Sequence, residues 1–287
     1  MKCCNCDRLM NQGLDFWHWK CNYCKYESSN LDSGINEIKK HLLINENERA
    51  NGLKILRDSN FRVLIRWILR QLPEGKHTLL EVGAGHGWFI KIASEYFHVL
   101  GVEPDNQVLQ DALPPNCSLI EGYFPEVLEN HQRFDVIVFN DVFEHIIDVK
   151  KIITDCKMHL NKNGLLVLNL PSSLGFFYRI AKLLKHCGFS GPFERLWQKD
   201  FPSPHLHYFA PKNLIPLVEK NGFETIFMDH LPSIRKTGLY NRISHVNNQN
   251  KSPNKIIIFF MYLMVLLAIP LLKLFKSDIV VLIFRKE

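Results

Sequence analysis

The segment at residues 79–89, "LLEVGAGHGWF", constrains the fold most, because an apolar run passes directly into three alternating glycines and then into a helical pattern. Gly83, Gly85 and Gly87 carry no side chains, so the backbone N–H groups of this turn can approach a ligand closely. From residue 76 onward, short apolar runs alternate with helical ones, which is the pattern of a parallel sheet with crossover helices. The sequence therefore predicts an α/β fold with a ligand at the carboxyl end of one strand.

We expect seven strands, each a short apolar run bounded by turn or helix signals. The predicted strands are Thr78–Val82, Val99–Val102, Ser118–Ile120, Asp135–Phe139, Leu165–Asn169, Glu224–Met228 and Ile279–Phe284. Apolar residues at spacings of three and four predict helical structure from Ile35 to Leu72, ended by Pro73 to Gly75. A further helix is expected at Lys212–Asn221, and residues 247–254 read as a polar linker.

Residues 1–30 are rich in cysteine and have little apolar periodicity, so they cannot bury a core unaided. Two Cys-x-x-Cys pairs, Cys3 with Cys6 and Cys21 with Cys24, are separated by fourteen residues. Two such hairpins can place four thiolates around one tetrahedral Zn²⁺ that substitutes for a core. Redox-active or incidental thiols are the alternative, and Cys4 could replace Cys3 as a ligand. The spacing favours a structural zinc ribbon.

The glycine turn implies a nucleotide ligand when it is combined with the next strand. Glu103 follows Gly83 by twenty residues and ends the second predicted strand, where a carboxylate can accept both hydroxyl groups of a ribose. The glycines follow the spacing GxGxG, whereas the dinucleotide fingerprint is GxGxxG. The spacing therefore favours S-adenosylmethionine over NAD.

These motifs resemble those of the class I S-adenosylmethionine-dependent methyltransferases. Glu81 and the three glycines match that family's first motif, Glu103 matches its second acidic position, and "FDVIVFNDVFEHIID" and "NGLLVLNLPS" resemble its next signatures. The resemblance covers residues 76–230 and the final strand, and it implies a doubly wound, Rossmann-like, seven-stranded sheet. It also implies that Asp141 lies near the methionine moiety and Glu121 near the adenine. The second assignment is weaker, because "EGYF" departs from the family's usual turn.

Methyl transfer to a hydroxyl group needs a positioned acceptor and removal of its proton, for which histidine is suited. His205 and His207, in "FPSPHLHYF", lie between the fifth predicted strand and the next helix, where this fold builds its lid. His145 follows Glu144, and His86 lies in the glycine turn. We take His205, His207 and His145 as candidate bases. Each could instead be a half-buried structural histidine.

The lid region, residues 172–209, is long, apolar and aromatic. An amphipathic helix there fits an apolar or membrane-borne acceptor, and equally fits a helix that packs on the core. "DVFEHI" also resembles the quinone-biosynthesis O-methyltransferases, in which nearby acidic residues hold a divalent cation. Asp141 and Glu144, placed three apart on one helical face, could do so here, but the cofactor role of Asp141 argues against a metal.

The basic excess of the chain is confined to its C-terminal part. The formal charge is +6, yet residues 231–287 contain nine Lys or Arg and two acidic residues, so the first 230 residues are nearly neutral. Nucleic-acid binding is therefore not expected. This basic part flanks residues 256–272, seventeen apolar residues that as a helix measure about 26 Å, a little short of a bilayer core of about 30 Å.

A single crossing by this run would separate the last strand from its own sheet, so we expect residues 251–276 to dip into the membrane and return, to lie in its interface, or to pack on the protein or a dimer partner. The expected organisation is a zinc ribbon (1–30), a helical connector (31–75) and a methyltransferase domain (76–287). No secretory signal precedes the cysteines, which favours a reducing cytosol and a peripheral or monotopic position on the inner face of the membrane.

The first expectation for function is O-methylation of a surface glycan, a lipid-linked acceptor or a secondary metabolite. C-methylation of a nucleotide-linked sugar stays open. Two alternatives are an RNA methyltransferase guided by the ribbon, although residues 1–30 form only a weak basic patch, and an inactive cofactor-binding scaffold. A homodimer also stays open.

Overall fold

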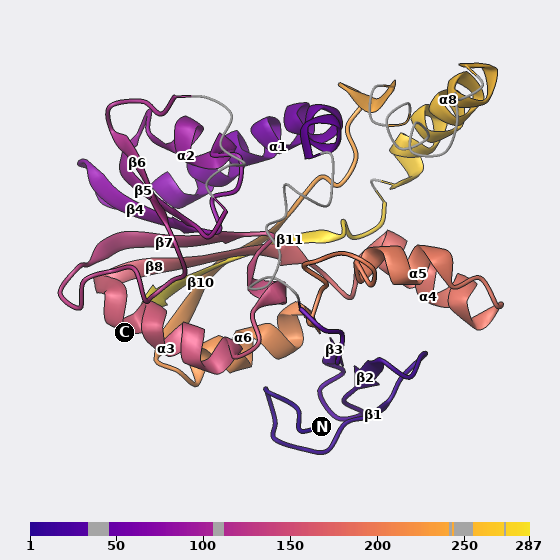
Figure 1. The fold of residues 1–287 in the computed structure, drawn as a ribbon, viewed down its shortest axis with the longest axis horizontal. Coiled ribbons are helices and arrows are strands. Elements are labelled where there is room, and N and C mark those ends of the chain that lie inside the picture. The colour runs from indigo at the N-terminus through magenta and orange to yellow at the C-terminus, as the bar shows by residue number, and fades with distance from the viewer. Residues whose placement is uncertain (34–45, 106–111, 241–242, 244–254, 273) are drawn as a thin grey trace.

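The computed structural model describes residues 1–33, 46–105, 112–240, 243, 255–272 and 274–287 (Figure 1). Within these residues the chain forms one large sheet with helices on both faces, and a small second sheet near the N-terminus. The predicted α/β architecture is confirmed.

The large sheet has seven strands in the order β10-β11-β8-β7-β4-β5-β6. They are β4 (His77–Val82), β5 (Phe97–Glu103), β6 (Cys117–Glu121), β7 (Phe134–Asn140), β8 (Leu160–Pro171), β10 (Phe223–Leu231) and β11 (Ile279–Lys286). Strand β11 pairs antiparallel with both neighbours, and the pairs from β8 to β6 are parallel. Each of the seven predicted ranges lies inside an observed strand.

The central strands are buried on both faces, as continuous apolar runs require. In β4, Leu79 belongs to the core beneath α1 (Glu46–Leu69) and α2 (Trp88–Ala93). The next residue, Leu80, belongs to the opposite core, beneath α3 (Val149–His159) and α6 (Pro211–Glu219). The first part of the predicted connector helix, residues 35–45, lies outside the described residues.

The small sheet joins the N-terminal ribbon to the lid. It contains β1 (Asn11–Gln12), β2 (His18–Lys20), β3 (Glu27–Ser29) and β9 (His207–Tyr208), in that order. Strand β9 comes from the lid, which also forms α4 (Phe176–His186) and α5 (Gly191–Leu196). The ribbon and the lid therefore share a sheet, although they are far apart in the sequence.

The ribbon and the lid also share an aromatic core. Its buried members are Trp17 from the ribbon and Tyr178, Ala181, Phe193, Trp197 and Tyr208 from the lid. Beside it, Glu27 of β3 accepts hydrogen bonds from Tyr178 Oη (2.6 Å) and Lys182 Nζ (2.6 Å) of α4. Burial alone would raise the pKa of Glu27, but His18 and Lys182 hold it at about 2. The ribbon is thus built into the lid.

The apolar run forms α8 (Lys255–Leu272), which follows β10 and precedes β11 in the sequence. In Figure 1 this helix projects away from the sheet. Its large exposed side chains are Phe259, Phe260, Met264, Leu267 and Leu271. Among the described residues, no helix combines the length and the hydropathy that a membrane span requires.

Candidate active site

The cofactor turn lies at the carboxyl end of β4. Gly83, Gly85 and Gly87 all have positive φ angles (74°, 48° and 73°), a conformation that residues with side chains rarely adopt. A Cβ atom on Gly83 would lie 2.5 Å from Val142 Cγ2, so the turn packs directly against the segment after β7. Glu103 Oε2 accepts a hydrogen bond from Gly85 N (2.8 Å), which ties the end of β5 to the turn.

Three polar side chains extend across the carboxyl ends of the central strands. Asn140 Nδ2 donates to Glu81 Oε1 (2.7 Å), and Asn169 Nδ2 donates to Asn140 Oδ1 (3.1 Å). Glu81 and Asn169 are buried, and among the described residues neither Glu81 Oε2 nor Asn169 Oδ1 has a hydrogen-bond partner. Such groups are costly unless a ligand or water satisfies them.

This arrangement fits S-adenosylmethionine. Burial raises the pKa of Glu81 well above its usual value in spite of the hydrogen bond from Asn140, and a bound cation would offset that effect. The ammonium group of the methionine moiety is such a cation. The two oxygens of Glu103 already accept backbone N–H groups, but each carboxylate oxygen has a second lone pair available for a ribose hydroxyl.

Asp141 follows β7 with a left-handed backbone (φ 54°), and Arg57 of α1 donates to its Oδ2 at 3.4 Å. The short 3₁₀ helix Phe143–His145 begins only after this residue. The expectation that Asp141 and Glu144 share one helical face is therefore wrong, because Asp141 lies before the helix and has a left-handed backbone. Sequence reasoning also missed Arg57, which lies 84 positions earlier.

Two side chains of the 3₁₀ turn, Glu144 and His145, form a group of titratable residues with His205 of the lid. Ligand atoms of Glu144, His145 and His205 all lie within 4.8 Å of one another, close enough for the three side chains to hold a divalent cation. Glu144 is fully buried (0% exposed), and among the described residues neither carboxyl oxygen has a hydrogen-bond partner. Burial and the nearby Asp141 raise the pKa of Glu144 well above its usual value.

The two histidines of this cluster are held differently. His145 Nδ1 donates to the carbonyl of Pro204 (2.8 Å), which in a neutral ring leaves the lone pair on Nε2. His205 Nε2 lies 2.9 Å from the side-chain amide of Gln198, and the two rings are 4.7 Å apart. Gln198 therefore engages the ring nitrogen of His205 that faces Glu144.

His207 has the contacts of a structural residue. It is only 8% exposed, its Nε2 donates to the carbonyl of Ile146 (2.7 Å), and its Nδ1 accepts from the hydroxyl of Tyr26. Burial lowers the pKa of His207 to about 4, so the ring is neutral at pH 7. Both ring nitrogens are occupied, which disfavours His207 as a base.

The remaining predicted positions are His86, within the glycine turn, and Glu121, at the end of β6. His86 stacks on Trp88 with ring centroids 4.8 Å apart, and it does not join the 3₁₀ cluster. Glu121 is exposed at the end of β6, opposite Glu103 in the β5–β6 register. That register is compatible with a place beside the adenosine.

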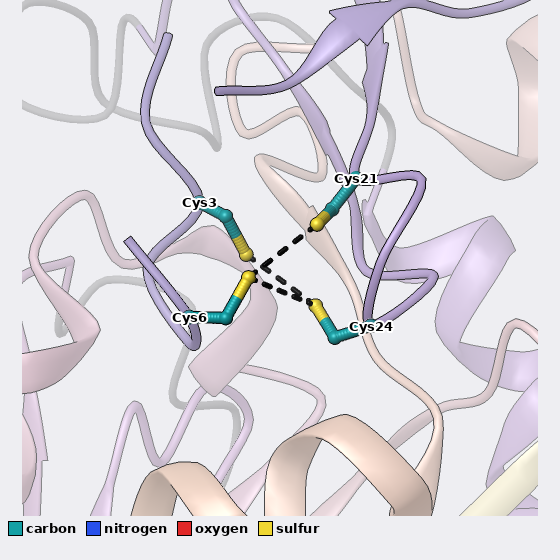
Figure 2. Close-up of side chains that lie close together, drawn as sticks. All are labelled: Cys3, Cys6, Cys21 and Cys24. Carbon is teal, nitrogen blue, oxygen red and sulfur yellow. Dashed lines mark hydrogen bonds between the residues drawn. The ribbon is translucent and has the colours of Figure 1, made fainter. Parts of the chain in front are cut away.

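The four ribbon cysteines converge in space (Figure 2). Sulfur atoms are 3.5 Å apart in the pairs Cys3–Cys24 and Cys6–Cys21, and 3.9 Å apart between Cys6 and Cys24. Four sulfurs bound tetrahedrally at about 2.3 Å from zinc lie about 3.8 Å apart. The donor set therefore fits Zn²⁺, and it contains Cys3 rather than Cys4.

The comparisons with known proteins agree with this site. The chain belongs to the family described as methyltransferase domain, whose model matches residues 56–226. The predicted resemblance to S-adenosylmethionine-dependent methyltransferases is thereby confirmed.

One curated relative is the ubiquinone biosynthesis O-methyltransferase of Bradyrhizobium diazoefficiens, 26% identical over 134 residues. The match covers 42% of this chain and about half (51%) of the relative. A methyltransferase solved in complex with a methyltransferase activator from Haloferax volcanii superimposes with a TM-score of 0.56 at 11% identity, covering 87% of this chain and 97% of that one.

An S-adenosylmethionine-dependent methyltransferase from Archaeoglobus fulgidus superimposes with a TM-score of 0.52 at 13% identity, covering 86% of this chain and 99% of that one. At these identities the superpositions show the shared fold.

We predict that Glu103→Ala weakens S-adenosylmethionine binding at least about 100-fold, because two charge-assisted hydrogen bonds of about 1.5–3 kcal/mol each are lost. Glu95→Ala, on an exposed side chain, is the matched control. Calorimetry measures both, and NAD is expected not to bind. Unchanged affinity in Glu103→Ala, or tight NAD binding, would contradict the cofactor assignment.

Proposed function

We propose that the protein is an S-adenosylmethionine-dependent methyltransferase that methylates an oxygen atom of an apolar or lipid-linked acceptor. The cluster of Glu144, His145 and His205 beside the cofactor turn carries this proposal, since it places a base where an acceptor hydroxyl would meet the methyl group. The relative named as an O-methyltransferase supports transfer to oxygen. The apolar lid and α8 support an apolar acceptor.

In this mechanism the cofactor supplies an electrophilic methyl group, and the chain supplies position and proton removal. His145 accepts the proton of the acceptor hydroxyl at Nε2 while its Nδ1 stays bonded to Pro204. S-adenosylmethionine, when bound, would supply the methyl group that the deprotonated acceptor oxygen receives. The imidazolium that forms lies within 4.8 Å of the buried Glu144 carboxyl and favours its charged form, so the two groups stabilise each other's charge.

We expect His145→Ala to reduce turnover about 10²–10⁴-fold while cofactor affinity stays unchanged. His131→Ala is the control, because His131 is exposed and distant from this cluster. Lipid and glycan extracts supply candidate acceptors, and transfer from labelled S-adenosylmethionine is followed by mass spectrometry for a 14-dalton gain. Turnover in His145→Ala within a few-fold of wild type would contradict His145 as the base and leave His205 as the candidate. Absence of methyl transfer to any extract would favour an inactive cofactor-binding scaffold.

We further propose that the ribbon binds one structural zinc ion. Burial raises the pKa of Cys3 and Cys24, whereas the backbone N–H groups of Cys24 and Tyr23 lower that of Cys21 against the opposing effect of burial, and a bound Zn²⁺ would favour the thiolate form of all four cysteines. Elemental analysis is expected to give one zinc per chain. Cys21→Ser should lose it, and Cys187→Ser, on an exposed thiol outside the cluster, should keep it. A metal-free chain with a folded ribbon would contradict the proposal.

The exposed apolar side chains of α8 support a position at an anionic membrane. They continue through Leu274 and Phe275, and the ring of Phe275 lies 4.7 Å from that of Phe176 in α4. Helix α4 of the lid also has exposed apolar side chains, Ile180 and Leu183. The basic excess of residues 231–287 would attract anionic headgroups.

We expect the protein to pellet with vesicles of phosphatidylcholine and phosphatidylserine, and to be released in part by high salt. Leu267→Ser combined with Phe260→Ser should weaken binding at least about tenfold, because each buried side chain contributes about 1.5–3 kcal/mol. Leu9→Ser is the control, since Leu9 and Leu267 are equally exposed (76%). Wild-type protein that ignores these vesicles would contradict the membrane assignment.

A further inference from the structure

A continuous path of hydrogen bonds leads from the ribbon to the 3₁₀ turn that carries the candidate base. Ser29, at the end of β3, donates from its backbone N to the carbonyl of Leu206 (2.9 Å). Leu206 N in turn donates to the carbonyl of Glu144 (2.9 Å). The segment 205–207 therefore lies between the ribbon and the turn and is bonded to both.

A second path uses side chains and ends on the other side of the same turn. Tyr26 lies between the zinc-ligand pair at 21 and 24 and strand β3, and its hydroxyl donates to His207 Nδ1. His207 Nε2 donates to the carbonyl of Ile146 (2.7 Å). Tyr26 and His207 are both buried, so water does not compete for these groups. Ile146 directly follows His145.

The turn depends on these outside contacts, because its own structure is slight. It spans three residues, Phe143–His145, and its N-cap residue Val142 makes no side-chain capping bond. Its internal hydrogen bonds are His145 N to Val142 O (3.0 Å) and Ile146 N to Phe143 O (3.4 Å). A turn of this length is marginal without tertiary contacts.

We infer that Tyr26 and His207 are positioning residues, through which the ribbon holds the Glu144–His145 turn in its catalytic geometry. The inference rests on the proposed function for its catalytic meaning, whereas the mechanical link can be measured without any acceptor. It gives the ribbon a role inside the enzyme, because Cys21 N donates to the carbonyl of Tyr26 (2.8 Å) and so connects the cysteine cluster to Tyr26, His207 and the turn.

The test compares Tyr26→Phe and His207→Gln with Tyr208→Phe in the full-length protein. Tyr26→Phe removes the hydroxyl that orients His207, and His207→Gln keeps a donor near Ile146 but loses the ring. Tyr208→Phe is a matched control, because it removes a buried tyrosine hydroxyl from the strand that carries His207, and within the described part of the chain the hydrogen bond of this hydroxyl goes to Leu196 O (3.4 Å).

Hydrogen exchange of the peptide that covers residues 142–147 is the primary measurement. We expect exchange about three- to tenfold faster in Tyr26→Phe, the factor that corresponds to loss of one hydrogen bond, and wild-type exchange in Tyr208→Phe. His207→Gln should retain part of the protection. Equal exchange in Tyr26→Phe and wild type would overturn the inference, whether or not an acceptor has been found.

Kinetics provide the second measurement once an acceptor is identified. Tyr26→Phe should lower kcat about tenfold while the affinity for S-adenosylmethionine stays within about twofold of wild type, as displacement of a positioned base predicts. A change confined to cofactor affinity would overturn the inference. Faster exchange in a protein that transfers no methyl group would instead count against the proposed function and leave the positioning link intact.

Discussion

The parallel pairing of β4 with β5 and β7 is the constraint on which the rest of the site depends. It brings the carboxyl ends of three strands to one edge of the sheet, where Glu81, Glu103 and Asn140 meet. The same pairing packs Val142 against Gly83, so the cofactor turn is in contact with the segment that leads into the turn with the candidate base. The strand order therefore determines where a ligand can bind, and the side chains at this edge determine which ligand binds.

The sequence predicted those parts of the molecule that depend on local pattern. The apolar strand runs, the GxGxG turn and the two Cys-x-x-Cys pairs are each recognisable over a few consecutive residues. All seven strands predicted from such runs are present in the structure. The two-residue strand at His207–Tyr208 has no such pattern, because two residues cannot show a period. Its pairing with Glu27 and Ser28 joins segments about 180 residues apart, so only the folded chain reveals it.

The same reason explains why the roles of the histidines could not be ranked from the sequence. His205 and His207 look equivalent in "HLH", yet alternate residues of a short extended segment meet different neighbours. One faces Gln198 and Glu144, and the other is enclosed by Tyr26 and Ile146. Arg57 of α1 donates to Asp141, but the apolar spacing that predicts this helix says nothing about the partners of its polar side chains.

The ribbon illustrates how a segment without a core becomes part of an enzyme. Its buried Glu27 is satisfied by His18, Tyr178 and Lys182, so a charge that would be costly alone becomes a specific link to the lid. Further contacts between the ribbon and the catalytic domain run from Asn213 to Cys24 O and from Lys220 to Asn5 O. A ribbon committed to its own catalytic domain presents less surface to RNA, and this favours a role in holding the acceptor site over a role in capturing a nucleic acid.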